Sequence, residues 1–307
     1  MAKFQWEDHK QFISLINMLS LRNGGQLGPN DEEADEGVEV DVDNRWNQPF
    51  VGDSKEDELK QHFLDRFAEI MSRNKGGKHV CCVALRQSGD RRLDGDVKIS
   101  LLIARNVAFK NHDKKFCSTL QELLAAIGAS ADDEIRDLSE VKKKLWEESV
   151  HYNQPRIDHY ADSLRDNLKA FKSAGSLDSI PPYSSDPQFP PYGNFEPTTF
   201  CDDPGIGPYS ADTHDAYMRF AQERILELDN ILCTKGRAWR RRLVERTYAI
   251  RRMRSLQTLI NSCSKTSVRH KLFRDILFLG RLESCLQYVH GSGTAYTGVG
   301  PTIYYSH

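Results

Sequence analysis

Two apolar segments between His79 and Asn106 place the strongest constraint on how this 307-residue chain folds. The segments read HVCCVALRQ and VKISLLIARN, and the stretch that joins them, SGDRRLDGD, carries two glycines, three aspartates and two arginines. Short runs rich in Val, Ile, Leu and Cys around a polar loop predict a two-stranded antiparallel hairpin. Because an isolated hairpin is only marginally stable in water, we expect helices to cover its apolar side.

Amphipathic helices are predicted on both sides of the hairpin. One begins at Ser54, whose hydroxyl can cap its first turn, and another covers about residues 113–127. Residues 129–174 are typical of a helical hairpin whose second helix begins at Pro155. Apolar residues at helical spacing predict three further helices, at about 212–232, 237–261 and 268–289.

These elements predict an α+β fold that is predominantly α-helical, with one β-hairpin packed against helices and a C-terminal helical bundle. The expected segments are an N-terminal helix and acidic loop at 1–53, an α+β unit at 54–128, a helical hairpin at 129–174, a Pro-rich linker at 175–211, a helical bundle at 212–290 and a Gly-rich tail with a strand at 291–307.

Charge is unevenly distributed, although the formal net charge is only −2. Residues 31–43 hold eight acidic residues and no basic one, whereas residues 235–274 hold thirteen basic residues and the single acid Glu245. The two stretches can pair with each other or serve different partners.

The basic stretch predicts a helix that can contact a nucleic-acid backbone through guanidinium groups, with aromatic residues interleaved. The same pattern is also typical of a solvated or internally paired helix face, and both interpretations stay open. The candidate nucleic-acid-binding residues are Arg237, Trp239, Arg240, Arg241, Arg242, Arg251 and Arg254.

Eight of the twelve prolines lie between Ala174 and Ser210, including PPY at 181–183 and again at 190–192. This composition predicts an extended segment that is either a linker or a ligand for a polyproline-binding protein partner.

The cysteines and the absence of long apolar runs also indicate the cellular compartment. The seven scattered cysteines, without an apolar N-terminal signal stretch, predict reduced core thiols in a cytoplasmic or nuclear protein. No apolar run approaches the ~18 residues of a membrane helix, so we expect no membrane partner.

Familiar catalytic signatures are missing from the sequence, which contains neither His-x-Glu nor Pro-Cys-x-x-Cys. The weaker candidates each have a plainer interpretation. His151 and His159 are ordinary surface histidines, His112 beside Asp113 marks a helix start, and the Ser262-x-x-Lys265 pattern falls at a helix end. The glycines of residues 291–300 are typical of a flexible turn rather than a phosphate loop.

The hairpin VCCVALRQ to KISLLIARN resembles the opening hairpin of the cytidine-deaminase fold, and the layout is similar to large fungal nucleic-acid or nucleotide deaminase-like proteins. The resemblance implies an α/β/α sandwich in which a helical insertion separates the hairpin from a zinc-binding His-Ala-Glu helix. His307 then stands at the first metal-ligand position, whereas the catalytic Glu and the Cys pair are missing. No catalytic residue and no cofactor is therefore expected in this chain, and zinc only in a longer product.

Two functions follow as hypotheses. The first is a non-catalytic or truncated deaminase-like protein that contacts nucleic acid through the basic helix, and the second is a helical protein-protein interaction module without a catalytic site. An enzyme with an unfamiliar site stays open. The deaminase hypothesis expects residues 302–305 to lie beside the hairpin with His307 at a sheet edge, whereas the module hypothesis expects a free tail.

Overall fold

The computed structural model describes residues 55–76, 79–88, 98–129, 138–183, 208–293 and 302–305. All of them belong to the larger of two units into which the chain divides, Val51–Gln188 with Phe200–His307. The predicted N-terminal helix and acidic loop, the second PPY sequence and His307 lie outside the described residues.

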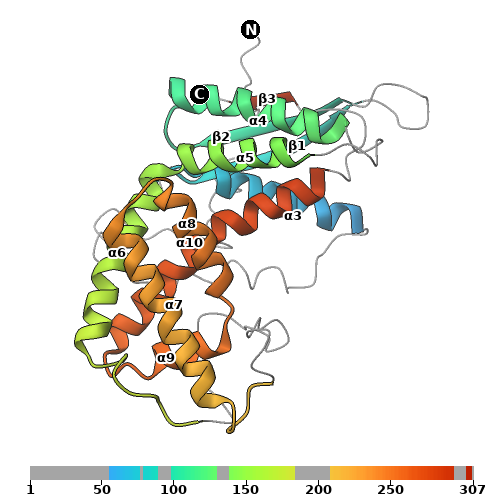
Figure 1. Cartoon of the computed structure of the whole chain (residues 1–307). Coiled ribbons are helices and arrows are strands. Elements are labelled where there is room, and N and C mark those ends of the chain that lie inside the picture. The colour runs from blue at the N-terminus through green and yellow to red at the C-terminus, as the bar shows by residue number, and fades with distance from the viewer. Residues whose placement is uncertain are drawn as a thin grey trace, which may run out of the picture. The chain divides into compact units, whose positions relative to one another are not determined.

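The predicted hairpin is confirmed and belongs to a three-stranded sheet with the order β1-β2-β3 (Figure 1). Strands β1 (Cys81–Ser88) and β2 (Lys98–Arg105) pair antiparallel, so that Cys81 lies opposite Arg105. Strand β3 (Thr302–Tyr305), which was predicted from the tail, pairs in parallel with β2. Because parallel strands need a crossover connection, the helices between β2 and β3 in the sequence form that connection.

The sheet buries one face and exposes the other, as its alternating sequence requires. In β2, Ile99, Leu101 and Ile103 are buried, whereas Leu102 and Ala104 are exposed. Ile303 of β3 lies beside Leu101 and is buried with it. The parallel strand therefore extends the apolar side of the hairpin.

Three helices accompany the sheet. Helix α3 (Lys55–Met71) packs against β1, and helix α4 (Asn111–Ala129) packs against β3. Helix α5 (Ser139–Tyr152) packs against α4, so these elements combine strands and helices in one core.

The remaining helices are α6 (Gln154–Ser173), α7 (His214–Thr234), α8 (Trp239–Ile250), α9 (Arg254–Asn261) and α10 (Thr266–Gly293). Helix α10 packs against α8, α6 and α3, and helix α7 packs against α8 and α9 (Figure 1). Pro155 lies in the first turn of α6, as predicted. The predominantly α-helical α+β class is confirmed. Helix α10 connects α6 and α8 with α3, the helix that packs against β1.

One predicted helix, at 237–261, is wrong because the chain breaks between α8 and α9. Met253 takes an extended conformation with φ −75° and ψ 123°, and it precedes the first residue of α9. The two halves pack differently, since α8 packs mainly on α10 and α9 packs mainly on α7, although each helix also contacts the other partner. A continuous amphipathic stripe cannot by itself reveal that its two halves have different main packing partners.

The six described cysteines are all free thiols. Cys81, Cys117, Cys263 and Cys285 are buried as predicted, but Cys82 and Cys233 are exposed, so the prediction of core thiols is wrong for these two. In the part of the chain that the structure describes, no helix is long and apolar enough to cross a bilayer.

Candidate functional site

The basic helix α8 is fastened to neighbouring helices by its own arginines. Arg240 donates two hydrogen bonds, of 2.7 and 2.9 Å, to the carboxylate of Asp158 on α6. Its guanidinium also lies 4.8 Å from the ring centroid of Trp239, which is only 8% exposed. Both residues were candidates for nucleic-acid contact, but Arg240 joins α8 to α6 and Trp239 is buried beneath it.

Arg241 is paired in a similar way. Its Nε donates to Glu245 at 2.7 Å, and Nη1 lies 3.9 Å from Glu147 of α5. The indole Nε1 of Trp146 donates to the same carboxylate of Glu245 at 3.2 Å. The single acid of the basic stretch thus connects α8 with α5.

Arg251 and Arg254 both lie against aromatic rings. Arg251 is 4% exposed, its guanidinium lies 3.8 Å from the Tyr248 ring centroid, and Nη1 donates to the Tyr248 carbonyl. Arg254 lies 4.7 Å from the Tyr209 ring centroid. The buried position of Arg251 leaves it no access to an external phosphate.

Arg237 and Arg242 differ from the others because they are exposed, and neither has a carboxylate partner among the described residues. They lie near each other, since Nη2 of Arg242 is 3.4 Å from the position that a Cβ on Gly236 would occupy. Of the seven candidates, these two alone combine an exposed position with a charge that has no carboxylate partner in the described structure.

A second polar site lies where β2 ends and α4 begins, and we name it the junction cluster. Its centre is Asp113, which is fully buried. Arg105 at the end of β2 donates to both carboxylate oxygens, and the hydroxyl of Tyr152 on α5 donates at 2.7 Å. The backbone N–H of Lys110 donates at 2.7 Å, an arrangement that caps the start of α4. The cluster comprises Arg73, His79, Arg105, Lys110, His112, Asp113 and Tyr152.

These donors keep Asp113 ionised. Burial alone would raise the pKa of this carboxyl, but the hydrogen bonds from Arg105, Tyr152 and the Lys110 amide outweigh burial and hold the pKa at about 2. A carboxylate this acidic, whose oxygens already accept these bonds, is a poor general base at neutral pH. The His112–Asp113 pair is therefore part of a helix start, as the sequence indicated, and not a catalytic dyad.

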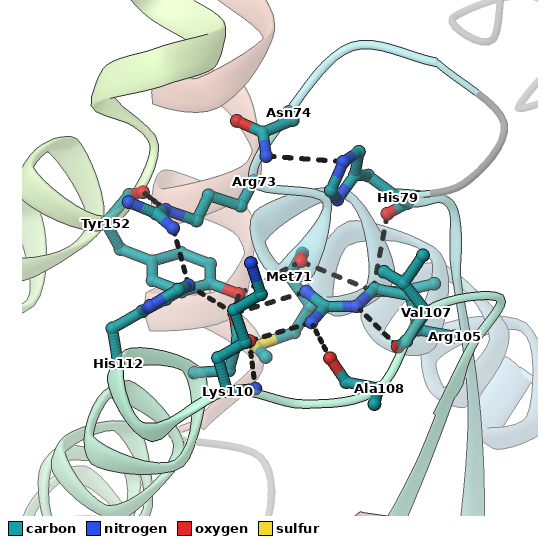
Figure 2. Close-up of polar contacts among 12 residues, drawn as sticks. Met71, Arg73, Asn74, His79, Arg105, Val107, Ala108, Lys110, His112 and Tyr152 are labelled. Carbon is teal, nitrogen blue, oxygen red and sulfur yellow. Dashed lines mark hydrogen bonds and ion pairs between the residues drawn. The ribbon is translucent and has the colours of Figure 1, made fainter. Parts of the chain in front are cut away.

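Arg73, Lys110 and His112 form the rim of the junction cluster, and this rim carries the cationic side chains of Arg73 and Lys110. Arg73 donates from Nε to the carbonyl of Tyr152 at 3.1 Å and from Nη1 to Nε2 of His112 (Figure 2). Burial lowers the pKa of His112, and Arg73, Lys110 and Arg105 lower it further, against the opposing charge of Asp113. His112 therefore accepts a hydrogen bond in its neutral form.

The sequence did not predict this cluster because three of its members, Arg73, His79 and Tyr152, are distant in sequence from residues 105–113 and join them only through tertiary packing. One local signal was present, namely an acid three residues after Lys110, the position from which a side chain reaches back to cap a helix. Nothing in the sequence indicated that Arg105 and Tyr152 would bury that acid.

The remaining predicted candidates that the structure describes are not gathered into a site. No group of three or more His, Cys, Asp or Glu side chains within the described ranges is placed to hold a metal ion. The ring of His159 packs edge-on against Tyr160, and the Ser262 hydroxyl donates to the Leu259 carbonyl at the end of α9. Of the glycine-rich turn predicted at 291–300, Gly291 and Gly293 instead continue helix α10, and the rest lies outside the described residues, as does His307.

The Pro-rich segment is held at both ends of its undescribed part, 184–207. Nε2 of His214 pairs with the carbonyl of Pro181, and Nδ1 of His214 lies 2.9 Å from the hydroxyl of Tyr209. Because a carbonyl can only accept, Nε2 carries the hydrogen and the Tyr209 hydroxyl donates to Nδ1 when the imidazole is neutral. The rings of Tyr183 and Tyr209 lie 5.8 Å apart, so the first PPY sequence contacts the fold, although Pro182 and Tyr183 stay exposed.

No protein-family model matches the chain, and no curated protein or solved structure is significantly similar to it.

Proposed function

We propose that this chain is a non-catalytic deaminase-like protein whose helical part serves contact with partners. The observation that carries the proposal is the parallel pairing of β3 with β2. The deaminase resemblance expected residues 302–305 beside the hairpin, whereas an interaction module with a packed hairpin expected a free tail. The pairing agrees with the first hypothesis and disfavours the second.

The residues present do not fit a zinc site. The sequence has no His-x-Glu and no Cys-x-x-Cys, so neither the acid/base carboxylate nor the thiolate pair of a zinc deaminase is supplied by these 307 residues. The proposal therefore assigns no deamination step to this chain. Its free thiols suit the reducing environment of the cytoplasm or nucleus.

Hydrogen exchange tests the structural basis of this proposal. The amides of residues 302–305 should be protected to a degree similar to those of β2, because a paired strand exchanges only when it opens. Exchange at the rate of a free peptide would remove the support for the deaminase resemblance and favour the interaction module. Reading the genomic DNA beyond codon 307 for in-frame His-Ala-Glu and Cys-x-x-Cys would test the family itself.

Nucleic-acid contact belongs to the same proposal, and the exposed pair Arg237 and Arg242 favours it. We expect the full chain to bind a single-stranded oligonucleotide with an affinity that falls as salt rises. Each phosphate contact on a single strand adds about 0.7 to the slope of log affinity against log salt, so the double variant Arg237→Ser, Arg242→Ser should lower that slope by about 1.4.

The matched control is Arg86→Ser, which removes an exposed arginine from strand β1 instead. Its salt slope should equal that of the wild type. No binding at low salt, or an equal loss for both variants, would exclude α8 as a nucleic-acid surface.

A protein partner for the Pro-rich segment is the other proposed contact. The first PPY is an unfavourable ligand, since His214 holds the Pro181 carbonyl and the Tyr183 ring packs on Tyr209. In the full chain, Tyr192→Ala should therefore weaken the binding of a polyproline-binding domain more than Tyr183→Ala does. Equal losses for the two variants would contradict this preference.

A further inference from the structure

We propose that the rim of the junction cluster, formed by Arg73, Lys110 and His112, is a binding site for a phosphate-type anion. The inference does not depend on the deaminase resemblance, and the site is separate from Arg237 and Arg242. It rests on a local excess of positive charge at a sheet edge.

The charge excess follows from the pairing within the cluster. Arg105 and Asp113 neutralise each other through two hydrogen bonds, and their side chains are 3% and 0% exposed. Arg73 donates only to neutral acceptors, the Tyr152 carbonyl and the His112 ring. The ammonium of Lys110, an exposed residue, has no partner in the described structure. Two cations therefore remain without a carboxylate.

The rim groups lie close enough to influence one another. Arg73, Lys110 and Arg105 each lower the pKa of His112, and the same three act on His79. Figure 2 shows that they come from three segments, with Arg73 after α3, Arg105 at the end of β2, and Lys110 and His112 at the start of α4. A charge-assisted hydrogen bond from such converging donors is the usual means by which proteins hold phosphate.

The position of the cluster favours a ligand site as well. Strands β2 and β3 are parallel, so their carboxyl ends meet at the sheet edge where Arg105 and the cluster lie. In open sheets with parallel strands, ligands bind outside the carboxyl ends of the strands. The ring nitrogen Nδ1 of His79 is buried there without a hydrogen-bond partner among the described residues.

An anion that does not itself titrate near neutral pH, such as sulfate, should also bind more tightly at low pH. Protonation of His112 adds a positive charge to the rim and ends its role as an acceptor from Arg73, which frees that guanidinium for the anion. The charged and titratable groups that face His112 are Arg73, Arg105, Lys110, Asp113 and Tyr152. Because Asp113 stays ionised and paired with Arg105, the titration of His112 dominates this dependence near neutral pH.

Calorimetry with inorganic phosphate and the full chain at low ionic strength tests the proposal. Lys110→Ala should weaken binding about tenfold, the effect of losing one charge-assisted hydrogen bond. The matched control is Lys142→Ala, which removes an exposed lysine about 15 Å along α5 from Tyr152. No phosphate binding by the wild type, or equal losses for both variants, would overturn the proposal.

A second measurement does not depend on how the variants fold. Sulfate, which stays dianionic over the pH range of a histidine titration, should raise the pKa of His112 when that ring is followed by NMR. An unchanged titration of His112 in sulfate would overturn the proposal. Titration with a single-stranded oligonucleotide distinguishes free phosphate from the phosphates of a nucleic-acid backbone. Lys110→Ala weakens oligonucleotide binding only if a backbone phosphate occupies this rim.

Discussion

Asp113 shows how a single residue fixes the meeting point of three elements. Its carboxylate receives hydrogen bonds from Arg105 on β2, Tyr152 on α5 and the Lys110 amide. We expect Asp113→Asn to lower the free energy of unfolding by about 3–5 kcal/mol, because the buried Arg105 charge loses its counter-ion. Urea denaturation at pH 7 measures this. Tyr152→Phe removes one donor only and should cost about 2 kcal/mol. A smaller loss for Asp113→Asn than for Tyr152→Phe would contradict the argument.

Asp113 also makes the free energy of unfolding depend on pH in the acidic range. The pKa of Asp113 is held at about 2, below the value of about 3.9 for an aspartate in an unfolded chain. The folded state therefore binds fewer protons, and the contribution of the pair is fully present above about pH 4 and is lost as the pH falls toward about 2. The difference in stability between wild type and Asp113→Asn should shrink over this interval. A constant difference would show that Asp113 does not titrate with folding.

Asp275 of α10 should show the opposite dependence on pH. It is fully buried against α6, where Ser163 and Asn167 donate to it at 2.7 and 2.8 Å. Burial raises the pKa of Asp275 despite these donors and the neighbouring Arg274. The folded state therefore favours the protonated carboxyl, and stability falls as the pH rises through the folded pKa.

Asp275→Asn cannot ionise, so its stability relative to wild type should increase between pH 4 and pH 7. Thermal unfolding across that range measures the trend. Asp166→Asn is the control, because this aspartate of α6 is 72% exposed and lacks the burial of Asp275. Equal pH trends for both variants would contradict the assignment to burial at Asp275.

At the scale of elements, Gly280 sets how closely α10 approaches α8. A Cβ at this position would lie 2.9 Å from both the backbone N and the Cα of Tyr248. Gly280→Ala gains about 1 kcal/mol of helix propensity, but backbone atoms cannot move aside as a side-chain tip can. We expect a net loss of about 1–2 kcal/mol in the free energy of unfolding, since overpacking typically costs about 1–3 kcal/mol. Ser284→Ala on the same helix is the control and should be nearly neutral. Equal stability of the two variants would contradict a tight α8–α10 contact.

Elements whose signals are local could be predicted from the sequence. The alternation of residues 81–88 and 98–105 gave the hairpin, Pro155 marked the start of α6, and residues 302–305 formed the expected strand. The break at Met253 carried no glycine or proline and accompanies a change of main packing partner, from α10 for α8 to α7 for α9. Likewise, charge counts alone did not separate the paired Arg240 from the exposed Arg237. Which acid a cation meets depends on tertiary packing.

At the scale of the whole molecule, strand β3 ties the end of the chain to its N-terminal half. Residues 106–301 separate β2 from β3 in the sequence, and α10 packs against α3 as well as against α6 and α8. Contacts between such distant segments must form together, so we expect the described elements to unfold in one cooperative transition.

Ile303→Ala tests that cooperativity. Ile303 is 8% exposed beside Leu101, so removing its side chain should cost about 2 kcal/mol, at the lower end for a buried isoleucine because the strand is short. Leu102→Ala, on the face where Leu102 is 43% exposed, should cost about 0.5 kcal/mol or less. Urea unfolding followed by far-UV circular dichroism, which reports the helices, and by amide exchange in β2 should give coincident curves that Ile303→Ala shifts together. If the variant moved only one of the two signals, the sheet and the helices would unfold separately, and β3 would not connect them.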